Sequence, residues 1–435
     1  FSDTNYSGGT LQAIIGDGYT GGKNYNQALR VSDGFGVSVS LDGNRLAVGS
    51  YLDDGLLANN GNAGAAYLYS FSDALFSSIA LESRIGYGYN GAKDINVALG
   101  NSDLFGYSVS LNGNRLAVGA YSDDGFGNGL TDSGAVYLFT FADSAFNGGS
   151  QQAIIGQGYT GGKNINNLTL DVSDTFGFSV ALNGTQLAVG TPNDDGFGNS
   201  FTNSGTAYLY NFSDSVFSSG VISAQIGNGY TGGKNINMAV TNSDAFGAAV
   251  GLSNNNLFVG AYGDDGFANS VGDSGAVFRY SFTDSVFSGG ALAASIGARY
   301  IGTNDYDLRG HLTSSDFLGR SLSVDGQNLV IGATLDDGFG NNAVDSGAIY
   351  LFQYTDMSYQ TPVLKGLAGA GYDLSILAKG IASTNVKEND FFGNAVSLDG
   401  NRMVVGSPRD DGFNDVGTDR GAVYLYSFTD STYSG

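Results

Sequence analysis

The chain has 435 residues, with 18 lysines and arginines against 41 aspartates and glutamates, and a formal net charge of −23. This acidic balance excludes a nucleic-acid groove and disfavours binding to an anionic membrane surface, because both need clusters of basic residues. The absence of cysteine excludes disulfides, thiolate metal sites and cysteine nucleophiles, and it is common in large exported bacterial proteins.

A phrase of the type Phe-Ser-Asp recurs at intervals of 70 to 74 residues and divides the chain into repeats. No run of 18 apolar residues occurs, so we expect no membrane insertion of this segment. The chain begins at Phe1 inside a repeat, which indicates a processed or excised part of a longer protein. The repeats cover residues 1–70, 71–140, 141–211, 212–281, 282–353 and 354–427, and 428–435 is the start of a further repeat or a closing segment.

The second repeat shows the predicted elements in chain order. Residues 105–111 alternate apolar and small side chains, which predicts a strand, and Asn112-Gly113 is typical of a two-residue hairpin turn. Apolar runs predict further strands over 116–120, 135–141 and 151–156. A loop over 121–134 connects the second and third strands, and a longer connection leads from the fourth strand to the next repeat.

Four antiparallel strands per repeat, six times, without helical periodicity, predict an all-β, six-bladed β-propeller that forms a single domain over 1–435. Residues 11–16 have the pattern of a fourth strand without the preceding three. The last repeat ends at a third strand, 421–428, without a fourth. We therefore expect the N-terminal strand to complete the last blade, and the alternative is an open solenoid whose ends mate with neighbouring molecules.

The segment from Phe105 to Phe139 resembles the FG-GAP repeat of integrin α-chain propellers. The likeness rests on Phe-Gly at the first strand, a Val-Gly-Ala step and a final Gly-Ala-Val-Tyr-Leu, and it covers about half of every repeat. Ser-Asp-x-Phe-Gly and Gly-Tyr-Thr-Gly-Gly-Lys-Asn are also similar to phrases in very large bacterial surface exoproteins of the haemagglutinin or adhesin type. Phe-Gly occurs at 35–36, 105–106, 176–177, 246–247 and 392–393, with the variant Phe-Leu-Gly at 317–319.

An Asp-Asp-Gly motif recurs in the loop between the second and third strands, and two interpretations stay open. In one, the motif forms a turn that was copied with the repeats. In the other it binds calcium, which takes 6–8 oxygen ligands. Calcium-binding FG-GAP repeats carry their Asp-rich loop between strands one and two, where this chain has only a tight turn such as 41–45, so the family's calcium ligands do not transfer. The candidate calcium ligands are Asp53, Asp54, Asp123, Asp124, Asn128, Asp132, Asp194, Asp195, Asp264, Asp265, Asp336, Asp337, Asp410 and Asp411.

The connection between the fourth strand and the next repeat carries Gly-Tyr-Thr-Gly-Gly-Lys-Asn in three repeats and irregular sequences in the fifth and sixth. In a four-stranded meander it lies on the same face as the Asp-Asp-Gly loops. Its side chains suit contacts with a glycan or peptide. The structural alternative is that tyrosine packs between blades and lysine pairs with aspartate. The candidate ligand-binding residues are Tyr19, Lys23, Tyr159, Lys163, Tyr230, Lys234, Tyr300, Tyr306, Arg309 and His311.

Catalysis is not expected. His311 is the single histidine, which excludes metal centres that need two, and the carboxylates repeat with the blades, whereas hydrolytic acids are placed asymmetrically. The aspartates before Phe-Gly are explained by turn formation. We expect a secreted or cell-surface adhesion module for a protein or glycan, without an organic cofactor. A self-associating subunit of a surface layer or filament is the alternative, and an acidic-residue glycosidase is the least favoured.

Overall fold

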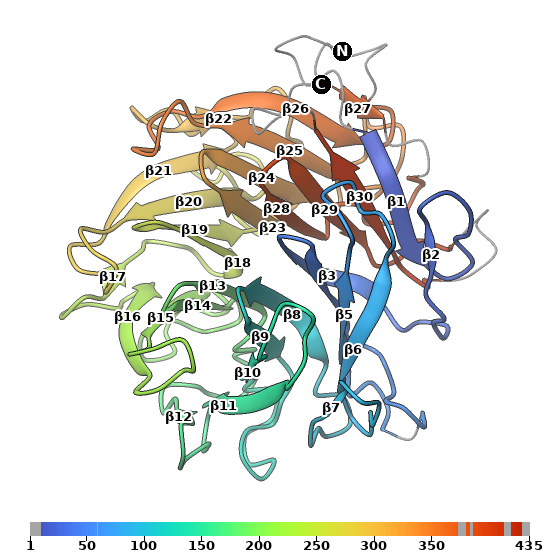
Figure 1. The fold of residues 1–435 in the computed structure, drawn as a ribbon. Coiled ribbons are helices and arrows are strands. Elements are labelled where there is room, and N and C mark those ends of the chain that lie inside the picture. Colours follow the sequence, from blue (N-terminus) through green and yellow to red (C-terminus); the bar gives the residue numbers. More distant parts are fainter. Residues whose placement is uncertain (1–9, 59, 373–379, 383–385, 413–418, 429–435) are drawn as a thin grey trace.

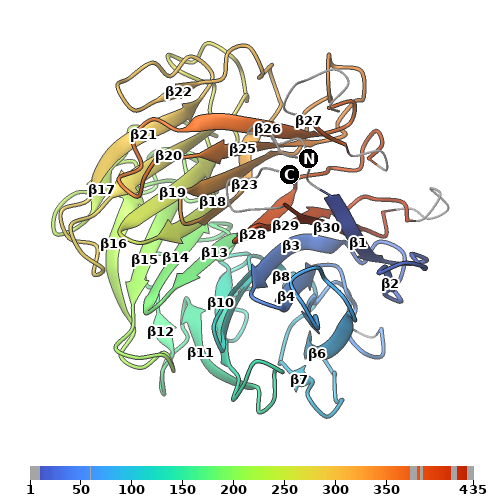
Figure 2. The same ribbon diagram turned by 45° about the horizontal axis from the view of Figure 1, so that its top comes forward.

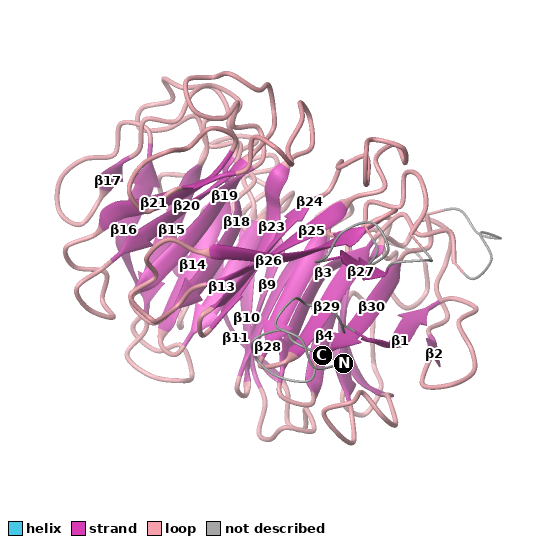
Figure 3. Cartoon of the chain, turned by 90° about the horizontal axis from the view of Figure 1, so that it is seen from above, coloured by secondary structure: helices cyan, strands magenta, loops and turns pink. Residues whose placement is uncertain are grey.

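The computed structural model describes residues 10–58, 60–372, 380–382, 386–412 and 419–428. In these residues the chain forms strands β1 to β30 and no helix, and no segment could therefore cross a membrane as an apolar helix (Figure 3). The strands make six sheets arranged around a common axis (Figures 1 and 2). The predicted all-β, six-bladed propeller is confirmed.

Blades 1 to 3 each consist of five consecutive strands. Blade 1 contains β3 (Phe35–Asp42), β4 (Arg45–Ser50), β5 (Ala65–Ser70), β6 (Ala80–Gly86) and β7 (Ile95–Asn96). Blade 2 contains β8 (Phe105–Asn112), β9 (Arg115–Ala120), β10 (Ala135–Thr140), β11 (Ser150–Gly156) and β12 (Ile165–Asn166). Blade 3 contains β13 (Ser179–Asn183), β14 (Gln186–Thr191), β15 (Thr206–Asn211), β16 (Val221–Gly227) and β17 (Ile236–Asn237).

Blades 4 and 5 follow the same order. Blade 4 contains β18 (Phe246–Ser253), β19 (Asn256–Ala261), β20 (Ala276–Ser281), β21 (Ala291–Gly297) and β22 (Tyr306–Asp307). Blade 5 contains β23 (Leu318–Asp325), β24 (Asn328–Ala333), β25 (Ala348–Gln353), β26 (Val363–Gly369) and β27 (Gly380–Ala382).

The sixth blade joins the two ends of the chain. Its members are β28 (Ala395–Asp399), β29 (Arg402–Ser407), β30 (Ala422–Ser427), β1 (Thr10–Gly16) and β2 (Tyr25–Asn26). β1 pairs with β30 in antiparallel register, with Ile14 opposite Tyr424, and the two strands lie side by side in Figure 1. The predicted closure by the N-terminal strand is confirmed, and the ring closes within one molecule.

Each blade has a short fifth strand that the sequence analysis missed. In blade 2, β12 pairs in parallel with β11 and places Ile165 opposite Ile155. A parallel pairing requires the chain to run back along the blade before it turns, because both strands must start from the same end. The connection between blades is therefore not a loop on one face, as we expected, but a segment that follows the outer edge of its blade.

Adjacent blades are joined through apolar clusters and through a close approach of glycines. Between blades 1 and 2, Leu68 packs with Phe105 and Tyr137. A Cβ atom on Gly119 of blade 2 would lie 1.9 Å from the carbonyl oxygen of Gly177 at the start of blade 3. This approach recurs at every interface, between residues 49 and 106, 119 and 177, 190 and 247, 260 and 319, 332 and 393, and 406 and 36. The Val-Gly step and the Phe-Gly step are thus the two halves of one interface.

We predict that Gly119→Ala lowers the free energy of unfolding by about 2–3 kcal/mol, because the new methyl group meets backbone and cannot be relieved by a side-chain rotation. Gly129→Ala in the same blade is the matched control, since its nearest neighbour would lie at an ordinary 3.7 Å. It should change the free energy by less than about 0.5 kcal/mol. Urea unfolding gives the free energy of unfolding of both variants. Equal losses in the two variants would contradict the claim that the interface between blades excludes a Cβ atom at Gly119.

Candidate functional site

The Asp-Asp-Gly loops lie at one end of the propeller, which we call the Asp-Asp-Gly face. It consists of the segments between the second and third strands of each blade: 51–64, 121–134, 192–205, 262–275, 334–347 and the described parts of 408–421. The first aspartate of each pair is buried, with 1–7% of its surface exposed. These carboxylates are therefore part of the framework of the face.

The first aspartate ties three segments together. In blade 2, Oδ1 of Asp123 accepts the backbone N–H of Gly125 at 2.8 Å, which closes the turn. Its Oδ2 accepts the hydroxyl of Tyr137 on β10 at 2.7 Å, and the hydroxyl of Tyr159, from the connection after β11, lies 2.9 Å from Oδ1. One carboxylate thus joins the loop, the third strand and the connection.

The second aspartate closes the other end of the loop. Oδ1 of Asp124 accepts the backbone N–H of Asp132 at 2.9 Å. The same contact spans eight residues in every blade, from 54 to 62, 124 to 132, 195 to 203, 265 to 273, 337 to 345 and 411 to 419. The two carboxylates of each pair therefore have different structural roles, and the turn interpretation accounts for both.

The candidate tyrosines of the connections are anchors in this framework. Tyr19 donates to Asp410 at 2.9 Å, and Tyr300 donates to Asp264 at 2.9 Å. Blade 4 has Phe278 where the other third strands place tyrosine, so Asp264 receives the connection tyrosine without a second phenol from β20. The full set of pairs is 19 with 410, 89 with 53, 159 with 123, 230 with 194, 300 with 264 and 372 with 336.

The candidate lysines reach the opposite end of the next blade. Nζ of Lys23 donates to the carbonyl oxygen of Leu75 at 2.6 Å, in the hairpin between the third and fourth strands of blade 1. Lys163 and Lys234 make the same contact with Val216 and Val286. The structural alternative paired these lysines with aspartate, and this was wrong. They donate to backbone carbonyl oxygens of the next blade and so connect successive blades.

The last three candidate residues lie along the connection from blade 4 to blade 5. Tyr306 on β22 packs edge-on against Phe352, with 5.2 Å between ring centroids. Arg309 is exposed and pairs with Asp307. His311 is exposed, and its carbonyl oxygen accepts the hydroxyl of Tyr350 at 3.3 Å. The side chain of Tyr306 thus contacts the third strand of blade 5, whereas Arg309 pairs with a residue two positions away in the chain.

The aspartate before Phe-Gly belongs to the same site, although sequence reasoning gave it only a turn. Oδ2 of Asp103 accepts the backbone N–H of Gly100 at 2.6 Å, which confirms the turn. Asp103 also lines a cavity of about 160 Å³ together with Asp123, Asp124 and Asn128. A constant interval was the available signal, because this aspartate stands 20 residues before the first Asp of the pair in every repeat: 33 and 53, 103 and 123, 174 and 194, 244 and 264, 316 and 336, 390 and 410.

Burial and neighbouring carboxylates raise the pKa values of several of these aspartates. Burial, and then the charge of Asp123, raise the pKa of Asp103 from 3.8 to about 7. The pKa values of Asp174 and Asp316 are raised to about 7 for the same two reasons, although in Asp316 the backbone N–H of Thr313 opposes the shift. In each of these three blades, neighbouring carboxylates therefore repel one another when they are ionised.

The donor set does not fit a calcium ion as it is arranged. Both oxygens of Asp123 already accept hydrogen bonds, and one oxygen each of Asp103 and Asp124 accepts a backbone N–H. Across the part of the chain that the structure describes, no group of three or more His, Cys, Asp or Glu side chains could hold a metal ion. Of the two interpretations of the motif, these contacts support the turn, and calcium binding stays the alternative.

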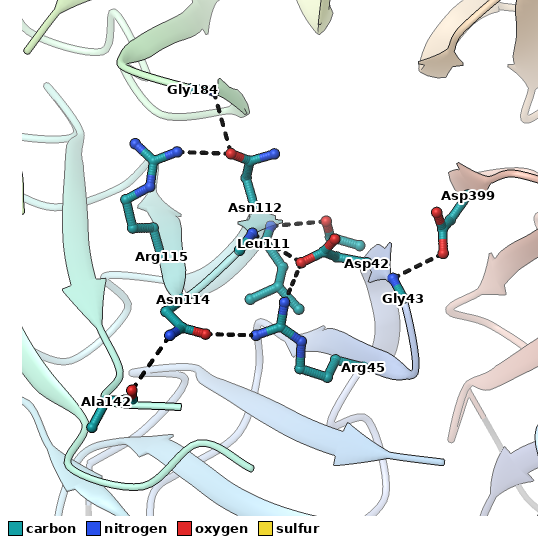
Figure 4. Close-up of polar contacts among 12 residues, drawn as sticks. Asp42, Gly43, Arg45, Leu111, Asn112, Asn114, Arg115, Ala142, Gly184 and Asp399 are labelled. Carbon is teal, nitrogen blue, oxygen red and sulfur yellow. Dashed lines mark hydrogen bonds and ion pairs between the residues drawn. The ribbon is translucent and has the colours of Figure 1, made fainter. Parts of the chain in front are cut away.

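The opposite end of the central channel is a ring of turn contacts. Figure 4 shows Asp42, at the end of β3, accepting the backbone N–H of a turn glycine in blade 2 at 2.9 Å and pairing with Arg45. Asn112 repeats this contact toward Gly184, at 3.3 Å, and Asp399 repeats it toward Gly43, at 2.8 Å. These polar groups line a cavity of about 410 Å³, and their hydrogen bonds pass from blade to blade.

Exposed aromatic rings mark the outer rim of the Asp-Asp-Gly face, a feature that the sequence analysis did not single out. Phe126, Phe197 and Phe267 follow the motif directly and have 68%, 65% and 53% of their surface exposed. Each packs edge-on against the connection tyrosine of its blade, at centroid distances of 6.0, 5.9 and 6.2 Å. We call Phe126, Phe197 and Phe267 the phenylalanine rim.

We predict that the fold becomes more stable as the pH falls from 8 to 5. The unfolded carboxyls titrate near 3.8, so in this window the folded state binds protons that the unfolded chain does not. Asp103→Asn should be more stable than the wild type at pH 8 and lose this advantage at pH 5, by urea unfolding. Asp143→Asn is the control, because hydrogen bonds with Asn147 lower its pKa, and it should gain nothing at pH 8. A free energy of unfolding that decreases from pH 8 to pH 5 would contradict the claim that the buried carboxylates repel one another.

Comparison with known families agrees with this architecture. The model of the FG-GAP repeat matches residues 30–69, 100–139, 171–210, 312–352 and 378–426. No curated protein matches the chain. Blade 4 lies outside the matched ranges and departs from the pattern with Leu-Ser-Asn-Asn-Asn at 252–256 and Arg279, yet it forms β18 to β22 like its neighbours. The chain therefore carries FG-GAP repeats in five of its six blades, and its repeats form a six-bladed β-propeller.

Proposed function

We propose that this propeller is a non-catalytic binding module that recognises a protein partner through its Asp-Asp-Gly face, at the cell surface or outside the cell. FG-GAP propellers commonly mediate protein binding. The acidic, cysteine-free composition supports an extracellular location. Adhesion is the role that such a module would serve.

The phenylalanine rim carries the proposal. Large aromatic side chains are costly to leave in water, and they are enriched at protein interfaces. Three such rings at equivalent positions of three consecutive blades form a surface that a protein can cover. This pattern favours a protein partner, because a protein can cover the rings with apolar side chains of its own.

The rim is presented by a rigid support. Phe126 packs edge-on against Tyr159, and the hydroxyl of Tyr159 donates a hydrogen bond to the buried carboxylate of Asp123. The loop itself is fixed at both ends by Asp123 and Asp124. Preorganised side chains lose little conformational entropy on binding, which is the property an interaction surface needs.

The alternative of a surface layer or filament is less well supported. Its main argument was a pair of complementary chain ends that could mate with neighbouring molecules. In the structure β1 pairs with β30 of the same chain, so these two strands are already satisfied. A glycosidase is also less well supported, because both oxygens of the buried Asp123, and of its counterparts in the repeats, accept hydrogen bonds within the framework.

We predict that replacing the rim, as Phe126→Ser, Phe197→Ser and Phe267→Ser together, weakens binding to an immobilised cell-surface protein fraction by at least about ten-fold, through loss of buried apolar area. The matched control is Leu75→Ser, Val216→Ser and Val286→Ser, three exposed apolar side chains on hairpins at the opposite end. Binding of the propeller to the immobilised fraction is measured by biolayer interferometry.

The outcomes separate the alternatives. A protein partner requires that protease treatment of the surface fraction abolishes binding and that periodate leaves it intact. Loss of binding in the control, or survival in the rim variant, contradicts the assignment to the Asp-Asp-Gly face. Light scattering at rising concentration should give a constant mass near 44.8 kDa, and growing polymers would favour the filament alternative.

A further inference from the structure

The central channel opens on the Asp-Asp-Gly face into a cavity that breaks the symmetry of the ring. The cavity has a volume of about 310 Å³ and is lined by residues of blades 1, 2, 5 and 6. Its walls come from the starts of first strands, such as Tyr107 and Asn394, and from positions just after second strands, such as Tyr51 and Arg409. Both sets lie at the same end as the Asp-Asp-Gly loops.

Two arginines converge on this cavity. Arg320 is the residue after the glycine of Phe-Leu-Gly in blade 5, where the other blades have uncharged residues: Val37, Tyr107, Phe178, Ala248 and Asn394. Arg409 follows the second strand of blade 6. Both side chains line the cavity. Two neighbouring blades, 5 and 6, therefore each contribute one arginine to it, from different positions of the repeat.

Aromatic rings hold both guanidinium groups in place. Arg320 lies over Phe178 at 4.7 Å and over Tyr262 at 5.8 Å, and it donates to the hydroxyl of Tyr107. Arg409 is exposed and lies over Phe391 at 4.2 Å. Such stacking orients a guanidinium but leaves most of its N–H groups free for an acceptor in the plane.

Among the residues that the structure describes, neither Arg320 nor Arg409 forms an ion pair with a carboxylate. Among the described residues, five other arginines form ion pairs with aspartate: Arg45, Arg84, Arg309, Arg402 and Arg420. No ion pair of Arg320 or Arg409 occurs in the same part of the chain. Among the described residues that line the cavity, Asp419 is the one carboxylate, and Asp345 lies near enough for its pKa to be affected by the charge of Arg409. Two guanidinium groups without an ion pair among the described residues therefore meet at one cavity of a protein whose net charge is −23.

We propose that this cavity receives a carboxylate, supplied by an acidic side chain of the protein partner. A guanidinium presents paired donors that match the two oxygens of a carboxylate. The volume corresponds to roughly ten water molecules at about 30 Å³ each, which suits one acidic side chain with its peptide group and not a folded segment. Tyr51 and Phe391 supply apolar walls beside the charged end.

This inference rests on the proposed function, because it assigns part of the Asp-Asp-Gly face to one chemical group of the partner. The phenylalanine rim and the cavity are separate features of that face. A test with small probes on the whole chain can therefore fail while the binding experiment with the rim variant succeeds, and the reverse also holds.

The probes are N-acetyl-glutamate N-methylamide and its neutral counterpart, N-acetyl-glutamine N-methylamide, titrated by saturation-transfer NMR. The glutamate probe should bind at least about ten-fold more tightly, since only it carries the charge. Arg409→Gln should remove this difference without changing the thermal midpoint, because the side chain is exposed. Arg309→Gln is the control, as it removes another exposed arginine, paired with Asp307, outside the cavity.

Equal binding of the two probes, or an unchanged preference in Arg409→Gln, would overturn the proposal. Glucuronate serves as a third probe, because a sugar acid presents the same carboxylate from a different source. Binding of glucuronate weaker than that of the glutamate probe supports an acidic protein side chain. Binding that is about ten-fold tighter would overturn that part of the proposal and assign the cavity to an acidic glycan.

Discussion

The close approach of glycines between blades is the constraint on which the rest of the structure depends. At each interface the carbonyl oxygen of the Phe-Gly glycine occupies the space where a Cβ of the preceding blade's Val-Gly glycine would stand. Gly177 itself adopts a φ of 89°, a conformation that favours glycine, and a Cβ there would meet the carbonyl oxygen of Ala135 at 2.6 Å. Backbone therefore packs on backbone, and this sets the spacing of the six blades.

The loops of the Asp-Asp-Gly face are built on hydrogen bonds within each blade. The buried Asp123 accepts the hydroxyl groups of Tyr137 and Tyr159, which come from the third strand and the following connection of the same blade. The cost is a cavity in which Asp103 also faces the pair and takes up protons near neutral pH. The benefit is a face whose exposed rings, such as Phe126, have little freedom to lose on binding.

The repeat period, the four main strands and the closure of the ring were all predictable, since alternation, turn residues and the half-blades at the two ends are local signals. The fifth strand was not, because two residues such as Ile165 and Asn166 carry no periodicity of their own. The hydrogen-bond partners of Tyr159 and Lys163 depend on the course of the connection along the blade. That course cannot be read from the sequence of one repeat. The shared site of Asp103 and Asp123 could have been predicted from their constant interval of 20 residues. The proximity of Arg320 and Arg409 could not, because it arises only when the blades close into a ring.

The central claim is that hydrogen bonds, and not a metal ion, hold the Asp-Asp-Gly face together. A thermal melt in excess chelator against millimolar calcium tests it most directly. We predict the same midpoint in both conditions, because the oxygens of the first aspartates are already engaged by tyrosine hydroxyls and backbone N–H groups. A site filled at 100 times its dissociation constant would stabilise the fold by about 2.7 kcal/mol, so a clear upward shift of the midpoint in calcium would contradict the account and make these loops cation sites.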